Sequence, residues 1–139
     1  MDSTQKTKEL AYALAKSLKP GDVLALSGDL GAGKTTFTRY LAEALGFKAR
    51  VQSPTFIIAR KYERATGDIK RIHHLDLYRL TVLAEVLELG LQDFFADSEA
   101  ISVIEWPEVA FEVLPTPHKR LHFEVVSDTE RKIHVQDIN

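Results

Sequence analysis

The sequence contains no cysteine, one tryptophan and one methionine. The missing cysteines exclude a disulfide framework and any thiolate metal or redox chemistry. No apolar run approaches the ~18 residues that a membrane-spanning helix needs, and the first residues do not have the pattern of a signal peptide. We therefore expect a cytoplasmic protein with no membrane partner. The formal net charge of −2 argues against a protein that holds nucleic acid by bulk electrostatics.

Length sets the expected domain organisation. A chain of 139 residues is expected to form one domain over residues 1–139, because single domains commonly contain ~100–150 residues. The histidines do not follow a recognised zinc-ligand spacing, so we interpret them as ordinary strand or surface residues. They are His73, His74, His118, His122 and His134.

The pattern of apolar residues predicts alternating helices and strands. Two tight turns, at residues 65–68 and 127–130, are each flanked by alternating segments and predict hairpins, so the sheet should be mixed rather than purely parallel. The expected helices are one that ends before Pro20-Gly21, one from about residue 34 to a C-cap at Gly46, and one over 84–95 interrupted by Gly90; the expected strands are 23–26, 56–62, a strand ending near Leu77, 100–106 and two strands within 121–138.

One stretch stands out for its chemistry. Gly28-Asp29-Leu30-Gly31-Ala32-Gly33-Lys34-Thr35 fits G-x-x-x-x-G-K-[ST] at every fixed position. An apolar strand precedes it and an amphipathic helix follows it, which is the structural context that a phosphate-binding loop needs. An ordinary glycine-rich turn with an incidental Lys-Thr pair would require all three features to mislead together.

The residue types in this loop match the needs of a triphosphate. Gly31 and Gly33 allow backbone N–H groups to approach the phosphates without interference from a Cβ atom. The start of the following helix adds the positive end of its dipole. Lys34 would reach the β- and γ-phosphates, and the Thr35 hydroxyl would ligate Mg²⁺. Thr36 is placed to meet the α-phosphate.

Hydrolysis would need carboxylates near this loop. Glu105 ends the apolar run 101–104, and the tips of such strands point at the nucleotide crevice. Asp76 lies between two leucines, so alternation places it on the opposite face from them, where it would hold Mg²⁺ or accept a proton. Arg79 would neutralise developing phosphate charge. The alternatives are a surface carboxylate for Glu105 and a structural Asp76–Arg79 pair that closes a loop.

Two further features have both a chemical and an ordinary interpretation. In Ser53-Pro54-Thr55-Phe56 the proline fixes a turn, and the Thr55 hydroxyl would reach a γ-phosphate as switch loops do; the alternative is a plain loop. Trp106 directly follows Glu105. It is either a core or sheet-packing residue or a crevice and partner contact linked to that acid.

Taken in order, these motifs resemble one family. The glycine loop with Thr36, then Ser53-Pro54-Thr55-Phe56, His74-Leu75-Asp76-Leu77-Tyr78-Arg79 and Glu105-Trp106-Pro107 are similar to those of the bacterial TsaE (YjeE) family. That family is the small ATPase of tRNA threonylcarbamoyladenosine biosynthesis. The segment 85–95 resembles the family's acidic and apolar helix. The likeness spans roughly residues 10–115, and the combination is far more specific than the loop alone.

The resemblance implies a fold, ligands and partners. The fold would be α/β, a three-layer P-loop NTPase with a mixed central β-sheet. ATP and Mg²⁺ would be the cofactors, TsaD and TsaB the partners, tRNA would be met only indirectly through the complex, and the free protein would be a monomer. Catalysis is expected to involve Lys34, Asp76, Glu105 and Thr55. The implied nucleotide contacts are Gly31, Ala32, Gly33, Lys34, Thr35 and Thr36, with Ser3 and Thr4 near the adenine, and the implied metal ligands are Thr35, Glu105 and Asp76.

Two other functions are compatible with the loop, and a third is not expected. A small-molecule kinase would use Asp76 as base for a substrate hydroxyl and Arg79 as phosphate clamp. A nucleotide-gated binding module would scarcely depend on turnover. A GTP switch is not expected, because the sequence has neither an N-K-x-D motif for guanine nor a D-x-x-G switch motif.

Overall fold

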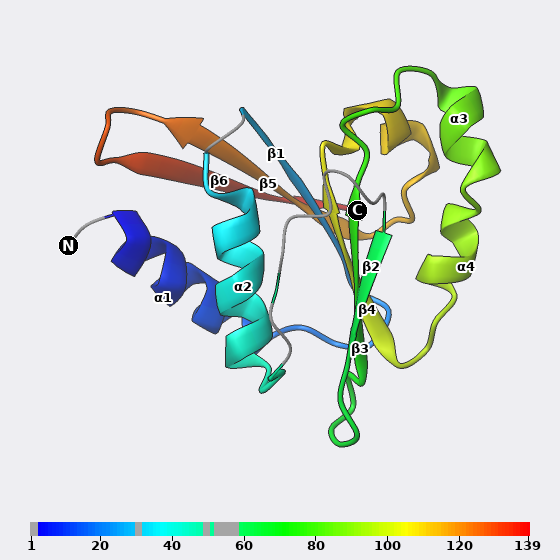
Figure 1. The fold of residues 1–139 in the computed structure, drawn as a ribbon, viewed down its shortest axis with the longest axis horizontal. Coiled ribbons are helices and arrows are strands. Elements are labelled where there is room, and N and C mark those ends of the chain that lie inside the picture. Colours follow the sequence, from blue (N-terminus) through cyan, green and yellow to red (C-terminus); the bar gives the residue numbers. More distant parts are fainter. Residues whose placement is uncertain (1–2, 30–31, 49–50, 52–58) are drawn as a thin grey trace.

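The computed structural model describes residues 3–29, 32–48, 51 and 59–139 (Figure 1). The chain forms both helices and strands, as the apolar periodicity predicts. In chain order they are α1 (Ser3–Ala15), β1 (Val23–Gly28), α2 (Lys34–Ala44), β2 (Ala59–Glu63), β3 (Arg71–Asp76), α3 (Leu83–Glu88), α4 (Leu91–Phe95), β4 (Ala100–Glu105), the 3₁₀ helix η1 (Pro107–Val113), β5 (His118–Val125) and β6 (Arg131–Ile138).

The strands form one mixed sheet in the order β2-β3-β4-β1-β5-β6. The inner strands β3, β4, β1 and β5 pair in parallel, whereas β2 and β6 pair antiparallel at the two edges. The expected mixed sheet is thus confirmed, and each edge strand is the hairpin partner of its neighbour. Because the inner strands are parallel, their carboxyl ends all lie at one edge of the sheet.

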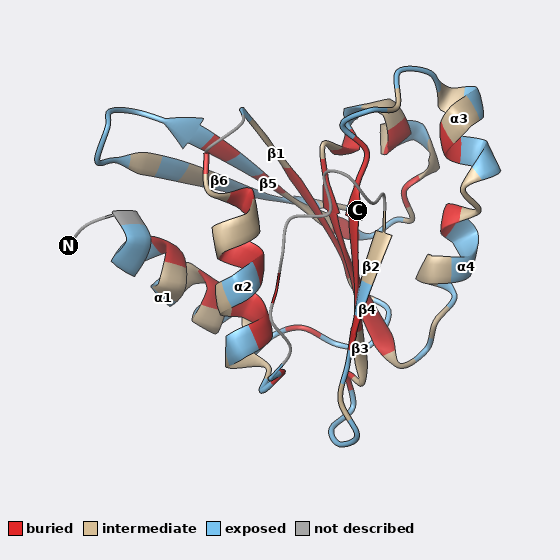
Figure 2. Ribbon diagram, in the orientation of Figure 1, coloured by how far each residue is buried: buried red, intermediate tan, exposed pale blue. Residues whose placement is uncertain are grey.

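Helices cover both faces of the sheet and produce the expected three layers (Figure 1). One core cluster joins α1 and α2 to the sheet through residues such as Phe37, Leu41 and Ile72. A second cluster joins α3, α4 and η1 to the other face, with Leu75 and Ile104 among its members. Strand β4 is buried at all six positions, which explains why it is apolar without alternation (Figure 2).

The observed elements match the predicted ones, and two strands differ at their ends. The predicted interruption of the 84–95 helix at Gly90 is confirmed, because two short helices flank this glycine, which adopts a left-handed conformation with φ 68°. Strand β4 ends at Glu105 rather than Trp106, which has φ 56° and is the N-cap residue of η1. Strand β3 ends at Asp76. In the described ranges, none of the helices has the length and apolar character needed to span a membrane.

A charged cluster fastens the start of β3 to the turn before β4. Asp97 accepts hydrogen bonds from the Arg71 guanidinium at 2.7 and 2.9 Å, and His73 Nε2 lies 2.8 Å from the same carboxylate. The hydrogen bonds from Arg71 hold the pKa of Asp97 well below its ordinary value, although partial burial opposes them. This cluster lies at the amino ends of the parallel strands.

The Asp97 cluster predicts an acid-sensitive contribution to stability. Since the folded-state pKa is depressed, the contribution is complete above the unfolded-state pKa of ~4 and is lost as the pH falls through the folded-state value. Asp97→Asn should lower the free energy of unfolding at pH 7 by about 1.5–3 kcal/mol, because a charge-assisted pair is lost. Urea unfolding at pH 7 and pH 3 measures both effects, with Asp128→Asn in the exposed β5–β6 turn as control. Equal stability of the two variants at pH 7 would contradict this role.

Candidate functional site

Four of the predicted site residues, Lys34, Thr35, Asp76 and Glu105, lie at the carboxyl ends of the parallel strands. Strand β1 ends at Gly28, where the glycine loop begins, and α2 starts at Lys34. On β4, Glu105 is in register with Leu26 of β1 on one side and with Asp76 of β3 on the other. The Glu105 carbonyl accepts from Leu77 N–H at 3.0 Å, and Trp106 N–H donates to Leu26 at 3.2 Å. The two carboxylates are therefore fixed beside the loop by strand pairing.

Alternation along the strands decides which way these side chains face. Ile72 of β3 packs in the α1–α2 core, whereas Leu75 packs in the opposite core. Asp76 shares its face with Ile72, and Glu105 shares its face with Val103, which also packs in the α1–α2 core. Both carboxylates therefore lie on the α2 face of the sheet, toward the first turn of that helix.

Two glycines shape the loop. Gly28 has φ 132°, and a Cβ atom there would lie 2.4 Å from the Phe123 carbonyl oxygen. Gly33 has φ 104° and stands at the N-cap of α2, where it provides no capping side chain. The first N–H groups of α2 consequently have no side-chain cap from that position, which suits them to bind an anion.

Lys34 lies inside the site rather than in solvent, with 5% of its surface exposed. Its ammonium group donates to the Gly28 carbonyl and lies 3.6 Å from the centroid of the Trp106 ring. Burial lowers the pKa of Lys34, and the charges of Glu105, Glu108, Asp76 and Asp29 oppose that shift. The side chain is thus a buried cation held at the mouth of the loop, where phosphate would be its natural counter-charge.

Trp106 contacts this lysine and so belongs to the crevice, the second of the two interpretations of its role. Within the described ranges it alone, apart from glycines, has a positive φ, 56°. Its ring lies 4.9 Å from that of Tyr78, measured between centroids. A strained backbone at the end of β4 therefore turns the indole over Lys34, a cation–π geometry.

Glu105 is a buried carboxylate with several polar neighbours. Only 3% of the residue is exposed. The Thr35 hydroxyl lies 3.2 and 3.1 Å from its two oxygens, and His74 Nε2 lies 2.5 Å from Oε2. The alternative of an exposed strand-end carboxylate is therefore wrong. A buried charge needs such partners, and the three groups form one connected network.

The donor atoms in this network suit magnesium. Thr35 and Glu105 offer a hydroxyl and a carboxylate in contact, and Asp76 stands beside Glu105 in the next strand. These are hard oxygen donors, which Mg²⁺ prefers. Over the part of the chain that the structure describes, no group of three or more acidic, histidine or cysteine side chains forms a metal cage. Such a site would share its ion with the phosphates of a bound nucleotide.

The remaining predicted residues lie in different parts of the chain. Ala32 is buried in the α1–α2 core, and Thr36 is half-buried in the first turn of α2. Asp76 is buried, and its Oδ1 accepts from Tyr78 N–H at 2.8 Å. Ser3 and Thr4 lie in the first turn of α1. Gly31 and Thr55 fall outside the described residues.

Sequence reasoning missed two members of the network. His74 was interpreted as an ordinary strand residue, yet it contacts Glu105 and is fully buried. Tyr62 of β2 lies behind it, with its hydroxyl 3.2 Å from His74 Nδ1. One signal was available: His74 precedes Asp76 by two positions and therefore shares its strand face.

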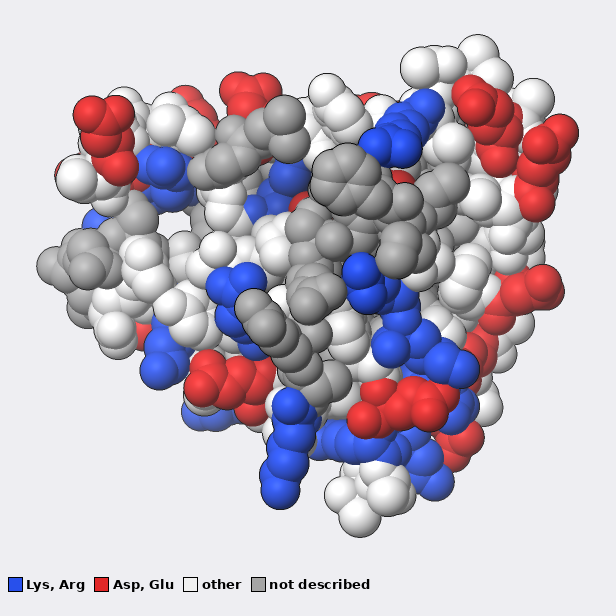
Figure 3. All heavy atoms as spheres, in the orientation of Figure 1, with Lys and Arg blue, Asp and Glu red and all other residues white. Residues whose placement is uncertain are grey.

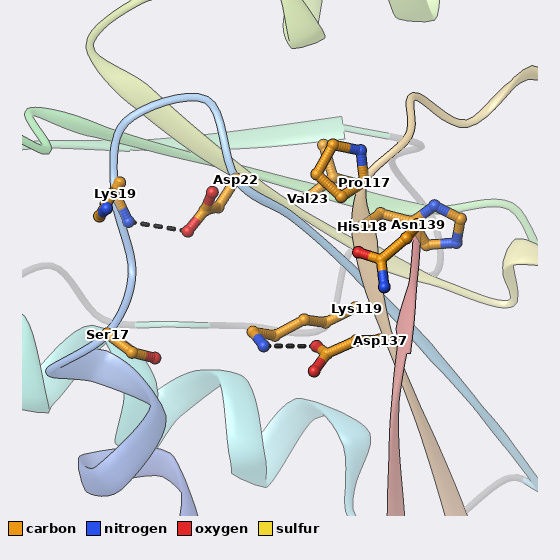
Figure 4. Close-up of a pocket in the computed structure, with 9 residues that line it drawn as sticks. All are labelled: Ser17, Lys19, Asp22, Val23, Pro117, His118, Lys119, Asp137 and Asn139. Carbon is orange, nitrogen blue, oxygen red and sulfur yellow. Dashed lines mark hydrogen bonds and ion pairs between the residues drawn. The ribbon is translucent and has the colours of Figure 1, made fainter.

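A separate cavity of about 350 Å³ lies at the amino ends of the parallel strands, at the opposite end of the sheet from Glu105 (Figure 4). Its lining comes from the starts of β1 and β5 and from the end of β6. Lys119 and Asp137 pair across it at 2.5 Å, and Lys19 N–H donates to Asp22 at 2.8 Å. These groups satisfy one another, and the cavity is separated from Glu105 by the length of the sheet.

Fold and site together define a class. A parallel inner sheet, a glycine loop that leads into a helix, and carboxylates at neighbouring strand ends are the architecture of P-loop NTPases. The family model described as "Threonylcarbamoyl adenosine biosynthesis protein TsaE" matches residues 1–133. The chain belongs to the TsaE family.

Individual relatives agree with this assignment. The chain is 40% identical over 129 residues to the tRNA threonylcarbamoyladenosine biosynthesis protein TsaE of Bacillus subtilis, a match that covers 93% of this chain and 78% of that protein. It is 44% identical over 128 residues to the protein of the same name from Streptomyces coelicolor, covering 91% and 84%. The crystal structure of Bacillus subtilis YdiB superposes with a TM-score of 0.75 at 34% identity, covering 94% of this chain and 78% of that one.

The buried ammonium group predicts the effect of its removal. Lys34→Ala should weaken any ATP binding by about 1.5–3 kcal/mol, or roughly 10- to 150-fold, because a charge-assisted contact to phosphate would be lost. Isothermal titration calorimetry measures the affinity. Arg39→Ala provides a control, since Arg39 is an exposed residue of the same helix. Equal ATP affinity for Lys34→Ala and the control would leave this site without support.

Proposed function

We propose that this protein binds ATP with Mg²⁺ and hydrolyses it in the biosynthesis of threonylcarbamoyladenosine in tRNA. The observation that carries the proposal is the contact between Thr35 and Glu105 directly beside the buried ammonium group of Lys34. A loop that only bound phosphate would not require a buried carboxylate at the neighbouring strand end. The family name, threonylcarbamoyl adenosine biosynthesis protein, supports the pathway.

Each residue has a distinct part in this proposal. Gly33 and the first turn of α2 bind the phosphates through backbone N–H groups. Lys34 leaves the Gly28 carbonyl and the Trp106 ring to contact the β- and γ-phosphates. Thr35 and Glu105 hold Mg²⁺, which neutralises phosphate charge when bound. Asp76 holds the same ion or positions the attacking water.

We further propose that hydrolysis serves a partner assembly of TsaD and TsaB. TsaD would transfer the threonylcarbamoyl group to the adenosine beside the anticodon of tRNAs that read ANN codons, and this ATPase would drive repeated turnovers. On the face seen in Figure 3, acidic side chains lie over α3 and α4, and acidic and basic side chains are interspersed elsewhere. That mixture supports indirect rather than direct contact with tRNA.

Phosphate release provides the first test of this proposal. We expect slow release from the protein alone and faster release when TsaD and TsaB are added. Labelled ATP should deliver its γ-phosphate to water. Label in a phosphorylated metabolite would instead indicate a small-molecule kinase, and fast release that TsaD and TsaB leave unchanged would contradict the accessory role.

Substitution of the buried acid separates binding from hydrolysis. Glu105→Gln should retain ATP binding in the absence of Mg²⁺, because Lys34 and the loop remain. Its turnover should fall roughly 100-fold, since the carboxylate charge is lost from the reacting region. Calorimetry and phosphate release measure the two effects, with Glu43→Gln, an exposed residue of α2, as control. Full turnover by Glu105→Gln would contradict the assignment, and a nucleotide-gated binding module would then be favoured.

A further inference from the structure

Glu105 is held from two sides, and only one of its partners comes from the glycine loop. Thr35 approaches at 3.1 and 3.2 Å from α2. His74 approaches at 2.5 Å from β3, on the far side from β1. The His74 side chain is fully buried, as is nearly all of the glutamate. The shorter of the two approaches therefore comes from a residue outside the glycine loop.

The groups involved limit the tautomer that this contact allows. A carboxylate oxygen accepts hydrogen bonds, so the contact with Glu105 is a hydrogen bond when His74 carries its proton on Nε2. In the neutral imidazole Nδ1 is then an acceptor, and the Tyr62 hydroxyl lies 3.2 Å from it. Tyr62, His74 and Glu105 thus form a chain that ends at the Glu105 carboxylate, to which the Thr35 hydroxyl also donates.

The neighbouring residue shows that this arrangement is specific to one histidine. His73 precedes His74 on β3 and faces the other way, where its Nε2 lies 2.8 Å from Asp97. Both histidines are buried and both contact a carboxylate. Only His74 contacts a carboxylate at the carboxyl edge of the sheet, beside the loop.

We propose that His74 is a positioning residue for Glu105, with the Tyr62 hydroxyl fixing the orientation of its ring. The inference rests on the proposed function. The orientation of the Glu105 carboxylate matters because Glu105 and Thr35 would hold Mg²⁺ there. Without His74, the carboxylate has one fixed partner instead of two and can turn away from Thr35. Groups behind a metal-binding residue typically contribute 10- to 100-fold to metal affinity or activity.

The test compares three substitutions. His74→Leu removes the donor, His74→Gln keeps an N–H group near the position of Nε2, and Tyr62→Phe removes only the hydroxyl. The measured quantity is the factor by which Mg²⁺ raises the affinity for ATP. We expect this factor to be roughly 10- to 100-fold smaller in His74→Leu than in the wild type. It should be close to the wild-type value in His74→Gln and intermediate in Tyr62→Phe. ATP affinity without Mg²⁺ should stay within about twofold of the wild type, because the loop and Lys34 are intact.

His73→Leu is the matched control, since it removes a histidine–carboxylate contact of the neighbouring residue on the same strand. It should lower the resistance to urea while leaving the Mg²⁺ dependence of ATP affinity unchanged. A purely structural role for His74 predicts that the two leucine variants behave alike. Should His74→Leu fail to fold, the comparison of His74→Gln with Tyr62→Phe carries the same test.

A second readout requires neither nucleotide nor turnover. Long-range ¹H–¹⁵N spectra of the nucleotide-free protein should assign the Nε2–H tautomer to His74, and Tyr62→Phe should shift its Nδ1 resonance. The Nδ1–H tautomer in the wild type would overturn the proposal. The proposal would also be overturned if the wild type binds ATP and both His74→Leu and Tyr62→Phe show the wild-type dependence of ATP affinity on Mg²⁺. A wild type that binds no ATP would overturn the proposed function instead, and the spectra would still decide how Glu105 is held.

Discussion

The carboxylate of Glu105 is buried at the carboxyl ends of the central strands, and the groups around it compensate for the loss of hydration. An unpaired buried charge is costly, so this position is compatible with folding only if hydrogen-bond donors and positive charge surround it. Thr35 and His74 are those donors, and Lys34 lies close enough for its pKa to respond to the glutamate. They come from α2 and β3, which are far apart in sequence and meet only because β4 lies beside β1 and β3.

The site has a buried cation and a buried anion, and each has partners within the protein. The Lys34 ammonium rests against the Gly28 carbonyl and the Trp106 ring. The Thr35 hydroxyl rests on Glu105. This arrangement keeps the polar groups satisfied in the absence of a ligand, and a polyphosphate with its metal would replace weaker partners with stronger ones.

Most of the fold was predictable, because the elements follow from local rules. The two hairpins, the split at Gly90 and the apolar strand before Glu105 were each visible as turn residues or periodicity. Element ends were less predictable. Trp106 would extend β4 by its type alone, but its left-handed backbone ends the strand there, and its ring contacts Lys34 and Tyr78.

By itself, the sequence determined the glycine loop, the acid that follows an apolar strand and the family to which the chain belongs. These depend on residue types at fixed spacing, which a linear sequence records completely. Tertiary structure alone decided which of two adjacent histidines contacts Glu105, that Tyr62 stands behind it, and that the single tryptophan covers Lys34. The physical reason is strand register, because a shift of one residue exchanges the two faces of β3 and would place His73 where His74 lies.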